Sequence, residues 1–240
     1  MCLLVVCPPG EVLSDKHIET AWRYNPNGGG FAHIGKAGRI RPFRSMSLKA
    51  MKMAYHAAVK QYPNSPFMVH FRLATHGKVN LDNVHPFKVN HHTYMAHNGI
   101  LSDVVPRGGM SDSKTFAKDW LSDLPRDFLD NWTITALIEE FTMGSKLAFL
   151  TTDPQLREQW YILNEGHGHW RDNKWYSNNT YVEFTPAKYV DECDLCGDVT
   201  YHNICFKCEI CQECDDWIEE CSCELAEENR ALVARINSMD

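Results

Sequence analysis

Residues 67–77 read Phe-Met-Val-His-Phe-Arg-Leu-Ala-Thr-His-Gly, and the first seven of them alternate in character. Phe67, Val69 and Phe71 face one way and Arg72 faces the other, because successive side chains of a strand point to opposite faces. The stretch therefore predicts a β-strand that seats one face in a core and presents Arg72 on the other.

Short strands and helices follow one another on both sides of this strand. Their order is mixed, with hairpins rather than regular βαβ units, which predicts an α+β protein with mostly antiparallel strands. The Asn98-Gly99 pair between strand-like residues is also a strong signal for a tight hairpin turn. We expect strands at 2–7, 93–96, 100–104, 147–150, 160–163, 175–177 and 181–184, helices at 48–62 (capped by Ser45 or Ser47), 111–124 and 134–141, and a turn at 25–30.

The composition is that of a globular protein. The chain has 240 residues, of which 44% are hydrophobic and 23% charged, as expected for one domain or one domain with a small appendage. No apolar run approaches the roughly 18–20 residues of a membrane span, and the apolar residues 3–6 are too few for the core of a signal peptide. We therefore expect a cytoplasmic protein without a membrane partner.

Charge is distributed unevenly and marks a domain boundary. Residues 191–240 contain 14 Asp/Glu and 3 Lys/Arg, a net charge of −11, whereas the remaining 190 residues contain 17 and 21, a net charge of +4. Binding to a nucleic-acid backbone depends on Lys and Arg, so an acidic segment disfavours that partner. We predict a first domain at 2–190 and a small C-terminal module at 191–240.

Eight of the ten cysteines lie in this C-terminal module. CxxC pairs in a chain without a visible export signal are typical of metal ligands rather than of a disulfide framework. Eight thiols can form two tetrahedral zinc sites, either successive or interleaved, with His202 as a possible substitute ligand and an iron–sulfur cluster as the alternative. We expect zinc to hold the module folded, followed by an amphipathic helix with an acidic face. The predicted ligands are Cys193, Cys196, Cys205, Cys208, Cys211, Cys214, Cys221 and Cys223.

Cys2 follows the initiator methionine directly. Methionine before a small residue is usually trimmed, which would give Cys2 a free α-amino group with a pKa of about 7.7–8.0. A thiol and a base on one residue form a self-contained nucleophile. The alternative is that Cys2 is a small apolar residue at the start of a buried strand. Cys7 is expected to be a core residue.

Several motifs occur in order along the chain. They are Cys2, Asn25-Pro-Asn-Gly-Gly-Gly-Phe-Ala, His70-Phe-Arg-Leu-Ala-Thr-His-Gly, Asn83-Val-His-Pro-Phe, His97-Asn-Gly-Ile-Leu, Ser111-Asp-Ser, Gly168-His-Trp and Trp175-Tyr-Ser-Asn-Asn. Together they resemble the class II glutamine amidotransferases over about residues 2–185. The resemblance implies the fold of N-terminal nucleophile hydrolases, a four-layer αββα sandwich of two antiparallel sheets. The family often has an aromatic residue after the arginine, where this chain has Leu73.

The resemblance implies a role for each matching residue. Cys2 is the nucleophile, and Asn98 and Gly99 form the oxyanion hole through a side-chain amide and a backbone N–H. Arg72 and Asp112 hold the α-carboxylate and α-ammonium groups of glutamine. Thr75 and His76 belong to a loop beside the substrate.

Structural explanations remain open for several of these residues. Arg72 could form a surface salt bridge, and Asp112 could cap a helix. Three further histidines are expected to be structural, namely His70, His85 and His97.

The sequence thus predicts an enzyme that hydrolyses the side-chain amide of glutamine to glutamate and ammonia through an N-terminal cysteine thioester. Because about 50 residues follow the glutaminase-like region, we expect a separate acceptor enzyme to use the ammonia. A silent amidotransferase-like scaffold, whose zinc module acts as a protein-binding adaptor, is the alternative. A third possibility is a different γ-glutamyl amide as substrate.

Overall fold

The structure is a computed structural model that describes residues 2–74 and 78–183, together with residues 204, 205, 208, 210, 211, 217 and 220. The chain divides into two compact units, Met1–Glu183 and Phe184–Asp240. In the second unit, β11 (Ile204–Cys205) pairs antiparallel with β12 (Ile210–Cys211), so that Cys205 lies opposite Ile210.

The first unit contains a six-stranded antiparallel sheet in the order β3-β2-β4-β1-β10-β9. Strands β1 and β4 form its centre and are buried on both faces, and Leu3 of β1 pairs with Phe71 of β4. The strands are β1 (Leu3–Cys7), β2 (Gly29–Ile34), β3 (Ile40–Ser45), β4 (Phe67–Phe71), β9 (His169–Arg171) and β10 (Lys174–Tyr176).

A second, four-stranded antiparallel sheet has the order β5-β6-β7-β8. Its strands are β5 (Phe87–Lys88), β6 (Thr93–Asn98), β7 (Lys146–Thr151) and β8 (Trp160–Leu163). Small residues allow the two sheets to pack closely, since Ala32, Ala96 and Ala148 belong to one buried cluster with Trp175.

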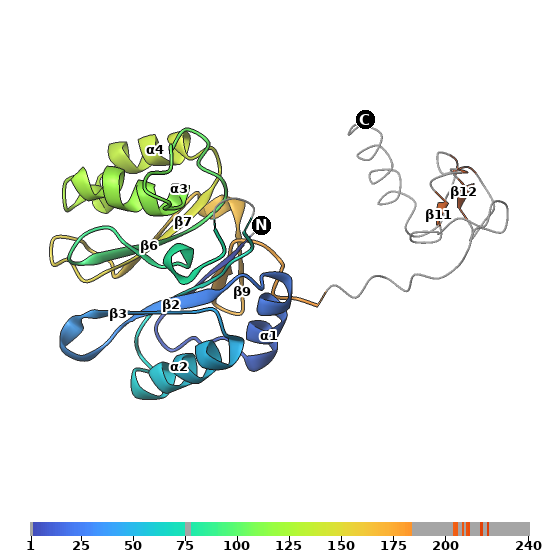
Figure 1. Ribbon diagram of the computed structural model, residues 1–240, viewed down its shortest axis with the longest axis horizontal. Helices are drawn as coiled ribbons and strands as arrows, with labels where there is room; N and C mark the ends of the chain where they lie inside the picture. Colours follow the sequence, from blue (N-terminus) through green and yellow to red (C-terminus); the bar gives the residue numbers. More distant parts are fainter. Residues whose placement is uncertain are drawn as a thin grey trace. The chain divides into compact units, whose positions relative to one another are not determined.

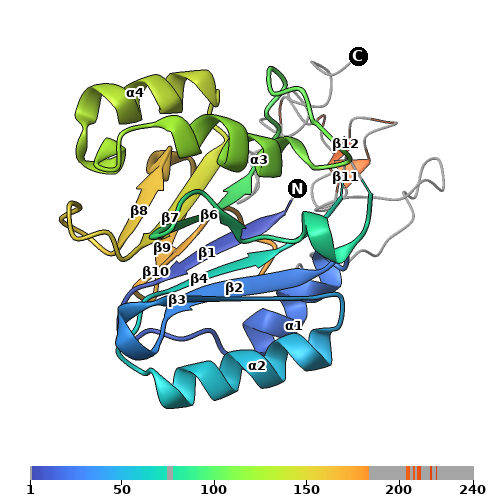
Figure 2. The same cartoon turned by 60° about the vertical axis from the view of Figure 1, so that its left-hand side comes forward.

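Helices cover the outer face of each sheet (Figures 1 and 2). α1 (Asp15–Tyr24) and α2 (Leu48–Gln61) pack on the six-stranded sheet through Ile18, Met51 and Tyr55. α3 (Asp112–Thr115), a π-helical turn (Phe116–Trp120) and α4 (Trp132–Phe141) cover the four-stranded sheet. The layers therefore follow the order helix, sheet, sheet, helix.

The predicted α+β class with antiparallel strands is confirmed. Ser47 caps α2, as one of the two expected residues. Two predicted strands are wrong, because residues 100–104 and 181–183 form turns and loops. None of the helices in the described part of the chain is long and apolar enough to cross a bilayer.

The sequence did not predict α1 or β3, and Gly29 and Gly30 were expected in the turn at 25–30 rather than in a strand. Both glycines instead lie in β2. A Cβ at Gly29 would overlap the side chain of Met51, and one at Gly30 would overlap the carbonyl oxygen of His85. Glycine serves here for close packing of a strand rather than for turn formation.

Candidate active site

Cys2 lies at the open end of the central strand β1 and is half-buried. Its Sγ accepts a hydrogen bond from the backbone N–H of Leu73 at 3.3 Å. Its carbonyl oxygen accepts one from Asn178 Nδ2 at 2.6 Å. The Leu73 backbone therefore holds the thiol, and the Asn178 side chain holds the Cys2 carbonyl group.

Burial raises the pKa of the Cys2 thiol, while the Leu73 N–H and the positive charge of Arg72 act in the opposite direction. Because burial is the largest effect, the thiol is predominantly protonated at neutral pH. A reaction that uses the thiolate therefore requires a base that accepts this proton.

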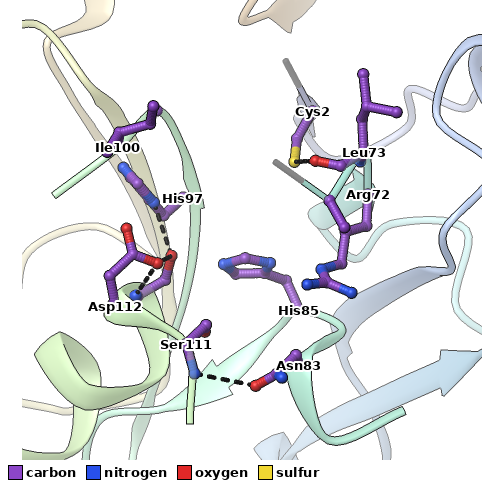
Figure 3. Close-up of a pocket in the computed structure, with 12 residues that line it drawn as sticks. Cys2, Arg72, Leu73, Asn83, His85, His97, Ile100, Ser111 and Asp112 are labelled. Atoms are coloured by element: carbon purple, nitrogen blue, oxygen red, sulfur yellow. Dashed lines mark hydrogen bonds between the residues drawn. The ribbon is translucent and has the colours of Figure 1, made fainter. Parts of the chain in front are cut away.

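A small polar cavity opens beside Cys2 (Figure 3). Its volume of about 40 Å³ corresponds to roughly three water molecules, which is enough for the charged end of an amino acid but not for a whole glutamine. The lining residues are Cys2, Arg72, Leu73, Ala74, Asn83, His85, His97, Gly99, Ile100, Ser111, Asp112 and Ser113.

Arg72 follows β4 and is 4% exposed, so it is not part of a surface salt bridge. Its Nη1 donates a hydrogen bond to the carbonyl oxygen of Lys78 at 3.2 Å. Burial lowers the pKa of Arg72, and the neighbouring acidic groups of Cys2 and Asp112 oppose this shift. Since guanidinium pKa values lie far above neutrality, Arg72 places a positive charge on one wall of the cavity.

Asp112 lies on the opposite wall (Figure 3). The helix cap is Ser111, whose hydroxyl accepts from the Lys114 N–H, so the alternative role of Asp112 as the cap is wrong. The Asp112 carboxylate instead accepts hydrogen bonds from the backbone N–H groups of Leu101, at 3.0 Å, and Ser113, at 2.8 Å. These contacts hold a half-buried carboxylate in a fixed orientation toward the cavity.

Asn98 and Gly99 lie where β6 ends, and the hairpin expected there is wrong. Asn98 pairs with Lys146 of β7, and residues 100–104 do not return along β6. A Cβ at Gly99 would overlap the side chain of Ser145. Position 99 therefore needs glycine for close packing against the neighbouring strand.

The carboxamide of Asn98 is buried and lies against Ser177. Asn98 Nδ2 is 2.7 Å from Ser177 Oγ, which also accepts the Leu4 N–H at 2.9 Å. Asn98 Oδ1 has no hydrogen-bond partner among the described residues. A half-turn of the amide would let Ser177 donate to Oδ1 and would free the NH₂ group.

A larger cavity of about 300 Å³ adjoins the first. The two cavities share Cys2, Leu73, Gly99 and Ile100. Lys146 and Ser145 line the larger one, together with Asn98. Cys2 thus lines both cavities, which together leave room for a molecule of the size of an amino acid.

His70, His85 and His97 are buried, and the last two line the smaller cavity. Burial lowers the pKa of His97 to about 4 and of His70 to about 3, and it lowers that of His85 well below its usual value. His97 Nδ1 lies 2.8 Å from Ser113 Oγ. Neither ring nitrogen of His85 has a partner among the described residues.

Several predicted residues lie outside the described residues. These are Thr75, His76, Cys193, Cys196, Cys214, Cys221 and Cys223. In the second unit, Cys205 is buried and Cys208 is half-buried. Only the backbone of Cys211 is described, and it lies in β12. No cluster of three metal-binding side chains occurs in the part of the chain that is described. Cys7 is fully buried in the core, as predicted.

Sequence reasoning assigned no role to Ser177, Asn178 or Asn83. Asn178 holds the Cys2 carbonyl, and Asn83 Oδ1 accepts the Ser111 N–H at 3.0 Å. The Trp175-Tyr-Ser-Asn-Asn motif contained two of these residues, and its polar residues directly after a strand were the available signal.

Comparison of the chain with protein-family models and with curated proteins finds no match. The functional assignment therefore rests on the geometry of the site.

Proposed function

We propose that this protein hydrolyses the side-chain amide of glutamine, with Cys2 as the nucleophile. The observation that carries the proposal is the cavity beside the Cys2 thiol, with Arg72 and Asp112 on opposite walls. A free amino acid needs one positive and one negative anchor for its zwitterionic end, and a reactive group at the distance of its side chain. Cys2, Arg72 and Asp112 come from separate elements of the fold and line this one cavity.

In the proposed reaction, Cys2 Sγ attacks the amide carbon of glutamine and loses its proton to the α-amino group of the same residue. The resulting oxyanion collapses, and the C–N bond breaks as the nitrogen receives that proton and leaves as ammonia. Water then attacks the γ-glutamyl thioester, which releases glutamate and restores the thiol. This route requires removal of Met1.

The state of the buried histidines supports the α-amino group as the base. The pKa of His97 is about 4, and burial also lowers the pKa of His85 well below its usual value. Groups with such low pKa values are weak bases at neutral pH. An α-amino group, with a pKa of about 7.7–8.0, is better matched to the task.

Asn98 and Gly99 are proposed to stabilise the oxyanion. They follow one another at the end of β6, and both line the larger cavity with Cys2. With the Asn98 amide turned as described above, Ser177 holds its oxygen and its NH₂ group is free to donate. Donors of this kind contribute about 10²–10³ in rate.

The architecture is consistent with the N-terminal nucleophile hydrolase sandwich that the sequence resembles. Two antiparallel sheets lie between two helical layers, and β1, which follows the nucleophile directly, is a central strand. Delivery of the ammonia to a separate acceptor enzyme stays a prediction. Zinc binding by the eight cysteines also stays a prediction. Two of the proposed ligands lie close together along the β11–β12 hairpin, because Cys205 ends β11 and Cys208 lies in the turn that follows.

The decisive experiment is the intact mass of the full chain before and after treatment with 6-diazo-5-oxo-norleucine, an electrophile that resembles glutamine. We expect a starting mass without methionine and one adduct, mapped to Cys2. Cys2→Ser should abolish the adduct, whereas the matched control Cys7→Ala, in the strand that follows Cys2, should retain it. Excess glutamine should slow its formation.

Retained methionine, or no adduct on Cys2, would reject the proposal and favour the silent scaffold. If Cys2 does form the adduct, turnover assays with glutamine, asparagine and γ-glutamyl peptides establish its substrate. Faster turnover of a γ-glutamyl peptide than of glutamine would contradict the assignment of glutamine.

A further inference from the structure

Two further cavities lie apart from Cys2, where the edges of the two sheets meet. The first, of about 450 Å³, is formed by β3 and β5, which are both edge strands, and by α3 with the π-helical turn that follows it. Its apolar wall includes Pro42, Pro86 and Phe87. This volume falls within the roughly 300–1,000 Å³ that is usual for small-molecule sites.

The polar side of the first cavity is cationic. Arg44, Lys88, Lys114 and Lys118 line it, and no described carboxylate does. These side chains come from β3, β5, α3 and the π-helical turn. The positive charge therefore arises because the fold brings four separate segments together, and not from a single basic stretch of sequence.

The second cavity, of about 580 Å³, continues the first, since Lys88 and Tyr94 line both. It adds Arg39, His91 and His92, again without a carboxylate among its described lining residues. Half-buried Tyr94 therefore lines two adjoining basic cavities.

The positive charge of this groove is not neutralised within the described part of the protein. Arg39, Arg44, Lys88, Lys114 and Lys118 make no ion pair there, whereas Lys52, Arg126 and Lys174 each pair with a carboxylate. Like charges in a concave site repel one another and focus the field toward an anionic ligand. A bound anion would relieve this repulsion.

We propose that this groove binds a small molecule carrying at least two phosphate groups. Lys and Arg side chains make strong charge-assisted hydrogen bonds with phosphate, and the cations of the first cavity are numerous enough for more than one phosphate. The proline and phenylalanine wall and Tyr94 would contact the uncharged part of the ligand. The two concave cavities, which share Lys88 and Tyr94, fit a compact ligand better than an extended polymer. This site stands independently of the proposed hydrolysis.

Isothermal titration of the full chain at about 150 mM salt, where exposed charges are screened, tests the site with three probes. Inorganic pyrophosphate reports on phosphate binding alone, ATP adds a nucleoside, and a hexose bisphosphate adds a sugar. We expect saturable binding of at least one probe with a Kd below about 1 mM, and the tightest probe identifies the source of the phosphates.

The double variant Lys114→Gln/Lys118→Gln should weaken binding by tenfold or more, because it removes two of the cations. Lys49→Gln, an exposed lysine on α2 outside both cavities, is the matched control and should leave the Kd unchanged. Thermal unfolding checks that the variants are folded.

Failure of all three probes to bind, or equal binding by the double variant, would overturn the proposal. Tighter binding of single-stranded RNA, with an affinity that grows with its length, would also overturn it in favour of a polymer site.

Discussion

Asn98 Nδ2 and Ser177 Oγ lie 2.7 Å apart and join the end of β6 to the residue that follows β10. The contact links the two sheets next to Cys2 and leaves Asn98 Oδ1 without a partner among the described residues. Turning the Asn98 amide by half a turn gives Oδ1 a partner, because Ser177 then donates a hydrogen bond to it. The NH₂ group is then free to donate a hydrogen bond to an oxyanion. Ser177 is thus a positioning residue.

Ser177→Ala should lower kcat by about tenfold while KM for glutamine changes little, because a donor used in the transition state becomes less well oriented. The matched control is Ser65→Ala. Ser65 is also a buried serine that accepts a backbone hydrogen bond, from Ile34 at 2.8 Å, but it does not line the Cys2 cavities. Both variants should lose similar stability, of about 1–3 kcal/mol. An equal loss of kcat in Ser65→Ala would refute the positioning role.

Asp112→Asn should raise KM for glutamine about 10- to 100-fold, since charged hydrogen bonds contribute about 1.5–3 kcal/mol. Glutaramic acid, which is glutamine without its α-amino group, provides the discriminating substrate. The native protein should bind it poorly, and Asp112→Asn should bind it no worse than the native protein does. If the substitution weakened both substrates equally, Asp112 would be structural rather than an anchor for the ammonium group.

The elements that could be predicted from sequence are those whose pattern is local. β4 was visible because its residues alternate, and α2 because its apolar residues follow helical spacing behind Ser47. The start of β2 at Gly29 and Gly30 was not predicted, because these glycines are required by the close approach of Met51 and His85, which are distant in sequence and which no local pattern reveals.

The candidate site divides in the same way. Cys2, Arg72 and Asp112 could be predicted from sequence, because a thiol and two charged groups suggest a chemical role by their residue type alone. All three line one cavity. Ser177 has no such signature, because its role depends on Leu4, 173 positions away, and on Asn98, 79 positions away. His85 was expected to be structural, although it lines the cavity.

Acid should destabilise the fold through the buried histidines. The pKa of His97 falls from about 6.5 to about 4 on folding, so its neutral form stabilises the fold above pH 6.5. Between about pH 6.5 and 4 the unfolded chain binds a proton that the folded chain excludes, and stability is lost. Urea unfolding at pH 7 and pH 5 should show this decrease, and His97→Gln should make it smaller. Substitution of the exposed His91 by Gln should leave the decrease unchanged; a similar effect of both variants would exclude His97 as its source.

Gly30→Ala should destabilise the protein by about 2 kcal/mol or more, because the added methyl group overlaps the backbone carbonyl oxygens of His85 and Phe43 and overpacking costs about 1–3 kcal/mol. Gly166→Ala is the control, since a Cβ there meets no atom within 4 Å. It should change the free energy of unfolding by less than about 0.5 kcal/mol. Urea midpoints that are equal for the two variants would contradict the packing of β2 against the 85–86 segment.

The pH dependence of catalysis tests the proposed base. In the free enzyme, kcat/KM should rise with pH and level off above about pH 8, because an α-amino group with a pKa of about 7.7–8.0 must be unprotonated to accept the thiol proton. Burial raises the pKa of the Cys2 thiol, so direct ionisation of the thiol would place the rise at a higher pH than the amine does. Insertion of lysine between Met1 and Cys2 prevents exposure of the Cys2 amine and should abolish turnover. Full activity of that insertion variant, or a rise centred near pH 6, would show that another group is the base.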